Sequence, residues 1–335
     1  DTLRIQGPQA NGKDITWEDL YLQAGAMLKA LAVSDKKVVL MTPTLASPAT
    51  EKIINDFIAV FPNVNHVIYD TISSDDALNA YEKYYGVRGL ADYDFSKAKT
   101  LVSIDADILG DWQGGGYESG YAKSRLPKRK TSKKAEMSWH IQFESNMSLS
   151  GANADHRIPC SPAEQKNILA YIYDTLIGSK SSINLNTQIK VAADKSVSRL
   201  IKSGKNGVLV SGIEDETAQS LVLAINTHLK SQAFEPKRPK YIRKGNSALV
   251  KKAINDIETG VVKGLISVGV NPVFTSAIGE SLKESIKGLE FSMAFTSKMN
   301  ETAAVSKFVA STPHYLESWG DYEMKEGHFA LAQPT

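Results

Sequence analysis

Two hydrophobic patterns alternate along the first half of the chain. Short β-branched runs predict strands at 36–43, 65–70 and 99–110, and apolar residues at helical spacing predict helices at 14–31, 47–62 and 75–86. Asp14 is the expected N-cap of the first helix, and Ser47 followed by Pro48 is a typical start for the second. Strands alternating with amphipathic helices indicate a parallel sheet covered on both faces.

The same order of elements returns further along the chain. A strand at 138–145 and a capped helix at 161–178 come first; the pattern then restarts near residue 180, with helices at 194–204, 215–232, 246–260 and 281–288 and strands at 206–212, 262–270 and 289–296. "VSIDADILGD" in the first half parallels "ISVGVNPVFT" in the second, and the polar turn 144–159 parallels 297–313. We therefore expect an internal duplication: two lobes, 1–180 and 181–335, in which 36–160 and 205–313 superpose.

Residues 111–136 interrupt this pattern. The segment is rich in glycine and in lysine and arginine and has no period, so we expect a long basic loop outside the core, mobile or at a subunit contact. Its glycines lack the spacing of a dinucleotide fingerprint. Because no aromatic residues alternate with the charges between Lys123 and Lys134, a solvated loop or protein-docking edge is favoured over nucleic-acid binding.

Composition narrows the class of protein only a little. The chain has 335 residues, 42% hydrophobic and 23% charged, with a net charge of +2, which are ordinary values for a soluble globular protein. The single cysteine excludes an intrachain disulfide or a four-cysteine metal site within these residues. No apolar run approaches the ~20 residues that span a bilayer. The start at Asp1, without Met, suggests a piece of a longer polypeptide.

No motif by itself builds a catalytic centre. The six histidines have no metal-ligand spacing, and His140 lies in a predicted strand, where a structural role is the default. Asp155 and His156 form a candidate acid–base pair, although such neighbours are usually structural. Cys160 has no histidine placed to activate it. On motifs alone, the chain is typical of a binding scaffold.

One resemblance is more specific. The segment "GLISVGVNPVFTS", with the later "SMAFTSKMNETAA", resembles the third domain of molybdopterin oxidoreductases of the dimethyl sulfoxide reductase superfamily. The first-half segment "IQFESNMSLSGANADHRIPC" narrows the resemblance to the molybdopterin-like part of the B subunit of alternative complex III, a bacterial membrane quinol oxidoreductase. The resemblance covers nearly the whole chain. It implies an α/β fold of two Rossmann-like lobes with mostly parallel sheets, related by a pseudo-twofold, whose strand-end loops grip the cofactor.

Several positions depart from the enzyme pattern. The triplet that begins at Glu144 stands where the enzymes have Asp-Pro-Arg. Asp105 and Asp107 lie in the first-half segment that corresponds to Gly-x-Asn-Pro. Residues 306–311 stand where the enzymes have Ala-Asp-x-x-Leu-Pro. Carboxylates repel phosphate unless a cation intervenes. We therefore expect a vestigial cleft without cofactor, filled by side chains such as Trp112 or Tyr117, at Asp107, Gly110, Asp111, Asn271, Pro272, Glu301 and Thr302.

The resemblance implies a cofactor-free scaffold in a respiratory complex that passes electrons from quinol to an acceptor such as cytochrome c. It implies no molybdopterin and no metal here, iron–sulfur clusters elsewhere in the same subunit, and partners that include multihaem and haem c cytochromes and quinol-binding integral membrane subunits. The implied location is the periplasmic face of the bacterial inner membrane, with no membrane span and no nucleic acid. The alternative is a working molybdenum reductase of the polysulfide or dimethyl sulfoxide reductase type, with Ser73 on the metal. A third possibility is a free-standing binding module.

Overall fold

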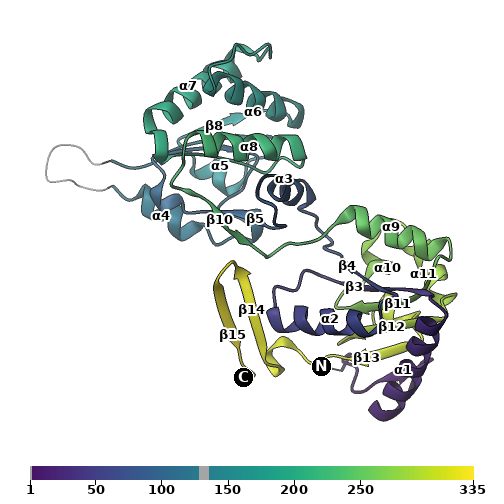
Figure 1. Ribbon diagram of the computed structural model, residues 1–335. Helices are drawn as coiled ribbons and strands as arrows, with labels where there is room; N and C mark the ends of the chain where they lie inside the picture. The colour runs from purple at the N-terminus through teal and green to yellow at the C-terminus, as the bar shows by residue number, and fades with distance from the viewer. Residues whose placement is uncertain (1, 128–135) are drawn as a thin grey trace. The chain divides into compact units, whose positions relative to one another are not determined.

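The computed structural model describes residues 2–127 and 136–335, which form two compact units (Figure 1). Unit 1 comprises Asp1–Ser73 and Arg243–Thr335, and unit 2 comprises Ser74–Ile242. The expected division at residue 180 is wrong, because unit 2 is inserted into unit 1. Strands from distant parts of the chain pair with each other, β3 with β11 in unit 1 and β6 with β9 in unit 2.

Unit 1 is a mainly parallel sheet with helices on both faces. Its strands are β1 (Gln9–Ala10), β2 (Lys13–Asp14), β3 (Lys37–Thr42), β4 (Val64–Ile68), β11 (Val262–Val268), β12 (Phe291–Thr296) and β13 (Phe308–Ser311), in the order β2-β1-β13-β12-β11-β3-β4. Its helices are α1 (Trp17–Val33), α2 (Pro48–Val60), α9 (Ser247–Glu258), α10 (Pro272–Thr275), α11 (Gly279–Lys287) and α12 (Glu301–Ala304). A 3₁₀ turn (Tyr315–Glu317) and the hairpin of β14 (Gly320–Lys325) and β15 (His328–Ala332) complete it.

The alternation along β3 shows how the unit 1 sheet is covered. Val38 and Leu40 pack toward α1 and α2, whereas Val39 and Met41 pack toward α9 and α11 on the opposite face (Figure 1). Successive strand residues point to opposite faces, so a continuous apolar run is buried on both sides. The expectation of a parallel sheet between two helical layers is confirmed for this part of the chain.

Unit 2 contains a second parallel sheet, in the order β8-β7-β6-β9. Its strands are β6 (Thr100–Ile104), β7 (Trp139–Glu144), β8 (His156–Pro159) and β9 (Gly207–Ser211), and β5 (Leu90–Tyr93) pairs antiparallel with β10 (Phe234–Lys240). Its helices are α3 (Asp75–Tyr85), α4 (Glu118–Arg125), α5 (Leu149–Asn153), α6 (Pro162–Leu176), α7 (Thr187–Ser203) and α8 (Glu216–His228), with 3₁₀ turns at Phe95–Lys97, Trp112–Gly114 and Gly204–Asn206.

The prediction of a basic loop at 111–136 is wrong for part of this segment. Residues 118–125 form α4, and Tyr117 and Tyr121 are buried at 4% and 6% exposure in the cluster on one face of the unit 2 sheet. Trp112 packs against the same cluster, within unit 2. Aromatic burial outweighed the glycine-rich local sequence. Residues 128–135, which hold most of the basic charges, lie outside the described part.

The expected duplication does not follow the predicted halves. Residues 36–160 contribute strands to both units, and so do residues 205–313. The first helix also begins later than expected, because Thr16, not Asp14, accepts the capping hydrogen bond from the Asp19 backbone amide. What does repeat is smaller: β6-β7-β8 in unit 2 and β11-β12-β13 in unit 1 are each three parallel strands, adjacent in this order.

Candidate functional site

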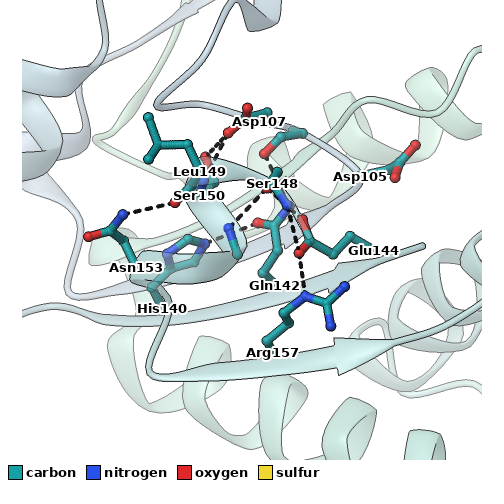
Figure 2. A network of polar contacts seen from close by, with 12 residues as sticks. Asp105, Asp107, His140, Gln142, Glu144, Ser148, Leu149, Ser150, Asn153 and Arg157 are labelled. Atoms are coloured by element: carbon teal, nitrogen blue, oxygen red, sulfur yellow. Dashed lines mark hydrogen bonds and ion pairs between the residues drawn. The ribbon is translucent and has the colours of Figure 1, made fainter. Parts of the chain in front are cut away.

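Polar side chains gather where β6 and β7 end in unit 2 (Figure 2). Asp107 lies just past β6, and its Oδ1 accepts hydrogen bonds from the backbone amide of Ser150 (2.9 Å) and from Ser150 Oγ (2.6 Å). Ser150 Oγ in turn accepts from the backbone amide of Leu109 (2.9 Å). Because Ser150 belongs to α5, these bonds tie the loop after β6 to the short helix after β7. We call this arrangement the strand-end clamp of unit 2.

Glu144, the last residue of β7, has a buried carboxylate with partners on both oxygens. Oε1 accepts from Arg157 Nε (2.6 Å) and from the Ser148 backbone amide (3.2 Å), and Oε2 accepts from Ser148 Oγ (2.6 Å). Ser148 also caps α5 by accepting from the Gly151 backbone amide (3.0 Å). A buried charge is tolerated when it is paired and hydrogen-bonded in this way.

Two glycines leave space for the carboxylates of Glu144 and Asp107. A Cβ at Gly151 would lie 1.9 Å from Glu144 Oε1, and one at Gly110 would lie 2.4 Å from Asp107 Oδ2. Both distances are far below van der Waals contact, so neither position has room for a side chain unless a carboxylate moves. Gly110, a predicted cleft residue, therefore allows the approach of the Asp107 carboxylate.

An equivalent clamp occurs in unit 1, where β11 and β12 end. Asn271 Oδ1 accepts from the Thr302 backbone amide (3.1 Å) and from Thr302 Oγ1 (2.8 Å), and Thr302 Oγ1 accepts from the Val273 backbone amide (3.2 Å). Asn271 Nδ2 donates to Glu301 Oε2 (2.6 Å), and Pro272 begins α10 with its side chain buried. The predicted residues Asn271, Thr302 and Glu301 thus contact one another.

The two clamps agree position by position. Asp107, Leu109 and Ser150 in unit 2 take the places of Asn271, Val273 and Thr302 in unit 1. The helix caps agree as well, because Ser148 and Asn300 each precede the clamp residue of the short helix by two positions. The sequence parallel between the polar turns therefore reflects the same local hydrogen bonding. Asp107, Gly110 and Asp111 lie in unit 2, whereas the other predicted cleft residues lie in unit 1.

Asp105 and Asp111 flank the unit 2 clamp without joining it. Asp105 has a left-handed backbone with φ of 58°, and its Oδ1 accepts from Gln165 Nε2 (3.0 Å). Desolvation raises the pKa of the Asp105 carboxyl, and the nearby Glu144 charge adds to the rise. Asp111 is exposed and precedes the 3₁₀ turn that begins at Trp112.

A row of buried, hydrogen-bonded polar side chains lies beside the clamp and was not predicted from the sequence. His140 Nδ1 lies 3.1 Å from Tyr121 Oη, and His140 Nε2 lies 3.2 Å from Gln142 Oε1. Gln142 Nε2 donates to the Ala106 carbonyl in the loop after β6 (3.3 Å). Burial lowers the pKa of His140 to about 4, so the imidazole is neutral near pH 7. The signal was the His-x-Gln-x-Glu alternation, which places three polar side chains on one face of β7.

The other residues considered for catalysis or metal binding do not form a reactive site. Ser73 is exposed, and its Oγ accepts from Ser247 Oγ (3.2 Å). Cys160 is buried, and desolvation raises the pKa of its thiol to about 12, which disfavours the reactive thiolate. Asp155 pairs with Arg125, so it does not act on His156. Residues 2–127 and 136–335 contain no cluster of histidine, cysteine and acidic side chains fit for a metal ion.

Most of the hydrogen-bond donors at the unit 2 clamp already bind a carboxylate of the chain itself. The amides and hydroxyls of Ser148 and Ser150 and the Arg157 Nε all donate to Glu144 or Asp107. A pyrophosphate needs such donors. These five donors are therefore not available to the pyrophosphate of a molybdopterin dinucleotide.

In the described part of the chain no helix is long and apolar enough to cross a membrane.

Comparison with known proteins identifies the fold but no family. No protein-family model and no curated protein sequence matches the chain. Among solved structures, acetylene hydratase from Pelobacter acetylenicus matches with a TM-score of 0.71 at 10% identity, over 99% of this chain and 58% of that chain. A chain of the formyltransferase/hydrolase complex from Methylorubrum extorquens, solved with methylofuran, matches with a TM-score of 0.63 at 12% identity, over 98% of this chain and 93% of that chain.

These matches correct one prediction. The structural neighbours are acetylene hydratase and a formyltransferase/hydrolase complex, so the identification with the B subunit of alternative complex III is wrong. The mixed α/β fold with parallel sheets is shown. The respiratory role, the cytochrome and quinol-binding partners, the iron–sulfur clusters and the periplasmic location were implied by that resemblance alone, and they remain untested predictions.

Proposed function

We propose that the chain is a binding scaffold of the molybdopterin-oxidoreductase type that carries no cofactor and acts as a subunit of a larger assembly. The observation that carries this proposal is the closed strand-end clamp of unit 2. Asp107 and Glu144 occupy the donors that a pyrophosphate would use. A carboxylate within ~4 Å of a phosphate costs about 4 kcal/mol at an effective dielectric near 20.

The clamp that occurs in both units supports a fold of two similar halves. Matching hydrogen bonds at Asp107 with Ser150 and at Asn271 with Thr302 support two Rossmann-like halves with the same local geometry at their strand ends. The match to acetylene hydratase supports a fold of the molybdopterin-enzyme kind. In this proposal the Asn-Pro turn at the end of β11 persists as architecture, because it begins α10 and supports the clamp whether or not a ligand binds.

One structural neighbour supports the role in an assembly. This chain spans only 58% of the acetylene hydratase chain but 93% of a chain from the formyltransferase/hydrolase complex. A chain of this fold therefore occurs as one component of a complex.

Two measurements test the proposal. The protein is purified from a host that makes molybdenum and tungsten cofactors, and metal is measured by mass spectrometry and pterin by fluorescence of oxidised extracts. We expect neither metal nor pterin in stoichiometric amount, while a known molybdopterin enzyme prepared in parallel gives both signals. Stoichiometric metal with pterin would overturn the scaffold and support the working-enzyme alternative, for which Ser73→Ala should then release the metal.

Co-purification tests the assembly separately. Affinity capture of the tagged chain from its native cells should return stoichiometric partner polypeptides that survive moderate salt. Recovery of the chain alone, with no metal or pterin, would contradict the assembly and leave a free-standing binding module.

A further inference from the structure

A compact basic cluster surrounds Trp139 at the start of β7, and we call it the Trp139 cluster. The Arg199 guanidinium lies 4.7 Å and the Lys195 ammonium 5.5 Å from the centre of the Trp139 ring. The His156 ring lies 5.6 Å from the same ring, and His156 Nε2 lies 2.9 Å from Lys195 Nζ. Lys195 and Arg199 are exposed on α7, one helical turn apart.

The positive charge of the Trp139 cluster is not neutralised by the described residues. Neither Lys195 nor Arg199 takes part in an ion pair there, and the acidic residues that precede His156 and Lys195 in sequence have other partners. Asp194 accepts from Lys190 Nζ (2.8 Å) and from Tyr171 Oη (2.6 Å), and Asp155 pairs with Arg125. Like charges four residues apart destabilise a helix, so this pair opposes the folding of α7.

The two cations are held in place, which favours binding. Arg199 stacks over an indole ring that is only 8% exposed, and this leaves the N–H donors at the edge of its guanidinium free to meet a carboxylate. Lys195 is held by His156. Such preorganisation lowers the entropy lost when an anionic group binds. We propose that the Trp139 cluster is the docking site for an acidic segment of a partner polypeptide, an inference that rests on the proposed role as a subunit.

A protein partner suits this surface better than a nucleic acid. Single-stranded nucleic acids bind through aromatic rings that stack on bases, but Trp139 is buried and its ring is covered by Arg199 and Lys195. The net charge of the whole chain is only +2, which provides no extended positive field for a phosphate backbone. Aspartate and glutamate side chains match a small, fixed pair of cations.

The test uses the full-length chain and a defined probe. A fluorescein-labelled peptide of alternating glutamate and serine is titrated with protein and followed by anisotropy at low and at moderate salt. Lys195→Gln combined with Arg199→Gln removes both charges of the cluster. The matched control, Lys29→Gln combined with Lys251→Gln, removes two charges from exposed helix positions in unit 1. Circular dichroism shows that each variant is folded.

The wild type and the control should bind the glutamate peptide alike, and the cluster variant should bind about tenfold more weakly. Arg199→Lys, which keeps the charge but loses the planar fork, should fall between them. Equal binding by the cluster variant and its control would overturn the proposal, and so would tighter binding of a single-stranded oligonucleotide than of the peptide. The metal and pterin measurements are independent of this result, so failure here would not be confused with failure of the scaffold proposal.

Discussion

Gly151→Ala should be far more disruptive than its chemistry suggests. The added Cβ would lie 1.9 Å from Glu144 Oε1, and ordinary contact begins at 3.4 Å, so the carboxylate has to move by about 1.5 Å. Such a shift removes at least one of the hydrogen bonds from Arg157 and Ser148, each worth about 1.5–3 kcal/mol because the acceptor is charged. Overpacking in a buried site costs a further ~1–3 kcal/mol. We expect the region to lose about 3–6 kcal/mol.

Hydrogen–deuterium exchange of the peptides covering β7 and α5 measures this loss locally, and urea unfolding measures it for the protein. Gly25→Ala is the matched control, because Gly25 lies in α1 with nothing within 4 Å of the added Cβ. That substitution should stabilise unit 1 by up to about 1 kcal/mol. A Gly151→Ala protein within about 0.5 kcal/mol of the wild type would refute the close packing of the Glu144 carboxylate against α5.

A double-mutant cycle tests whether the Glu144 carboxylate is the group that clashes with the added methyl group at position 151. If Glu144 is the group that the new methyl displaces, Gly151→Ala should add almost nothing once Glu144→Ala has removed the carboxylate. Additive losses would mean that α5 is disturbed for another reason.

Further predictions concern polar groups that are buried or half-buried. The pKa of His140 is lowered to about 4 in the folded protein and is 6.5 in the unfolded chain, so the unfolded chain binds the proton first as the pH falls. The free energy of unfolding should therefore fall by about 3 kcal/mol between pH 6.5 and pH 4. Urea unfolding at a series of pH values measures this loss, and His140→Gln should remove it. Asp107→Ala and Asn271→Ala should each destabilise their own unit by about 1–3 kcal/mol, and each should speed exchange there. Faster exchange after one substitution but not after the other would contradict equivalent clamps. Lys240→Met should speed exchange at residues 113–117, because Lys240 Nζ donates to the carbonyls of 113 and 115. Native Cys160, with a pKa of about 12, should resist iodoacetamide until urea exposes it.

Local sequence by itself determined most helices and parallel strands. Ser47 and Pro48 start α2, and Ser161 with Glu164 forms the capping box of α6, as their residue types predict. The apolar run of β3 is buried on both faces. Each of these features depends on residues within a few positions of one another, so the pattern along the chain contains the necessary information.

Only the tertiary structure decided how these elements are shared between the units. The pairing of β3 with β11 and of β6 with β9 joins residues more than a hundred positions apart. Periodicity indicates that a strand is buried but not which strand lies beside it. The predicted division at residue 180 failed for this reason, although the three-strand repeat behind the expected duplication is present in both units.

The candidate site was likewise determined partly by the sequence and partly by the tertiary structure. The sequence singled out Asp107 and Asn271 as strand-end positions and Glu144 as a departure from the enzyme pattern. It contained no sign that Gly151 leaves the space for the Glu144 carboxylate, or that Arg157 and Ser148 satisfy it. Whether a carboxylate repels a ligand or is neutralised by its neighbours depends on distances of a few ångströms between separate strand ends, and only the folded chain sets those distances.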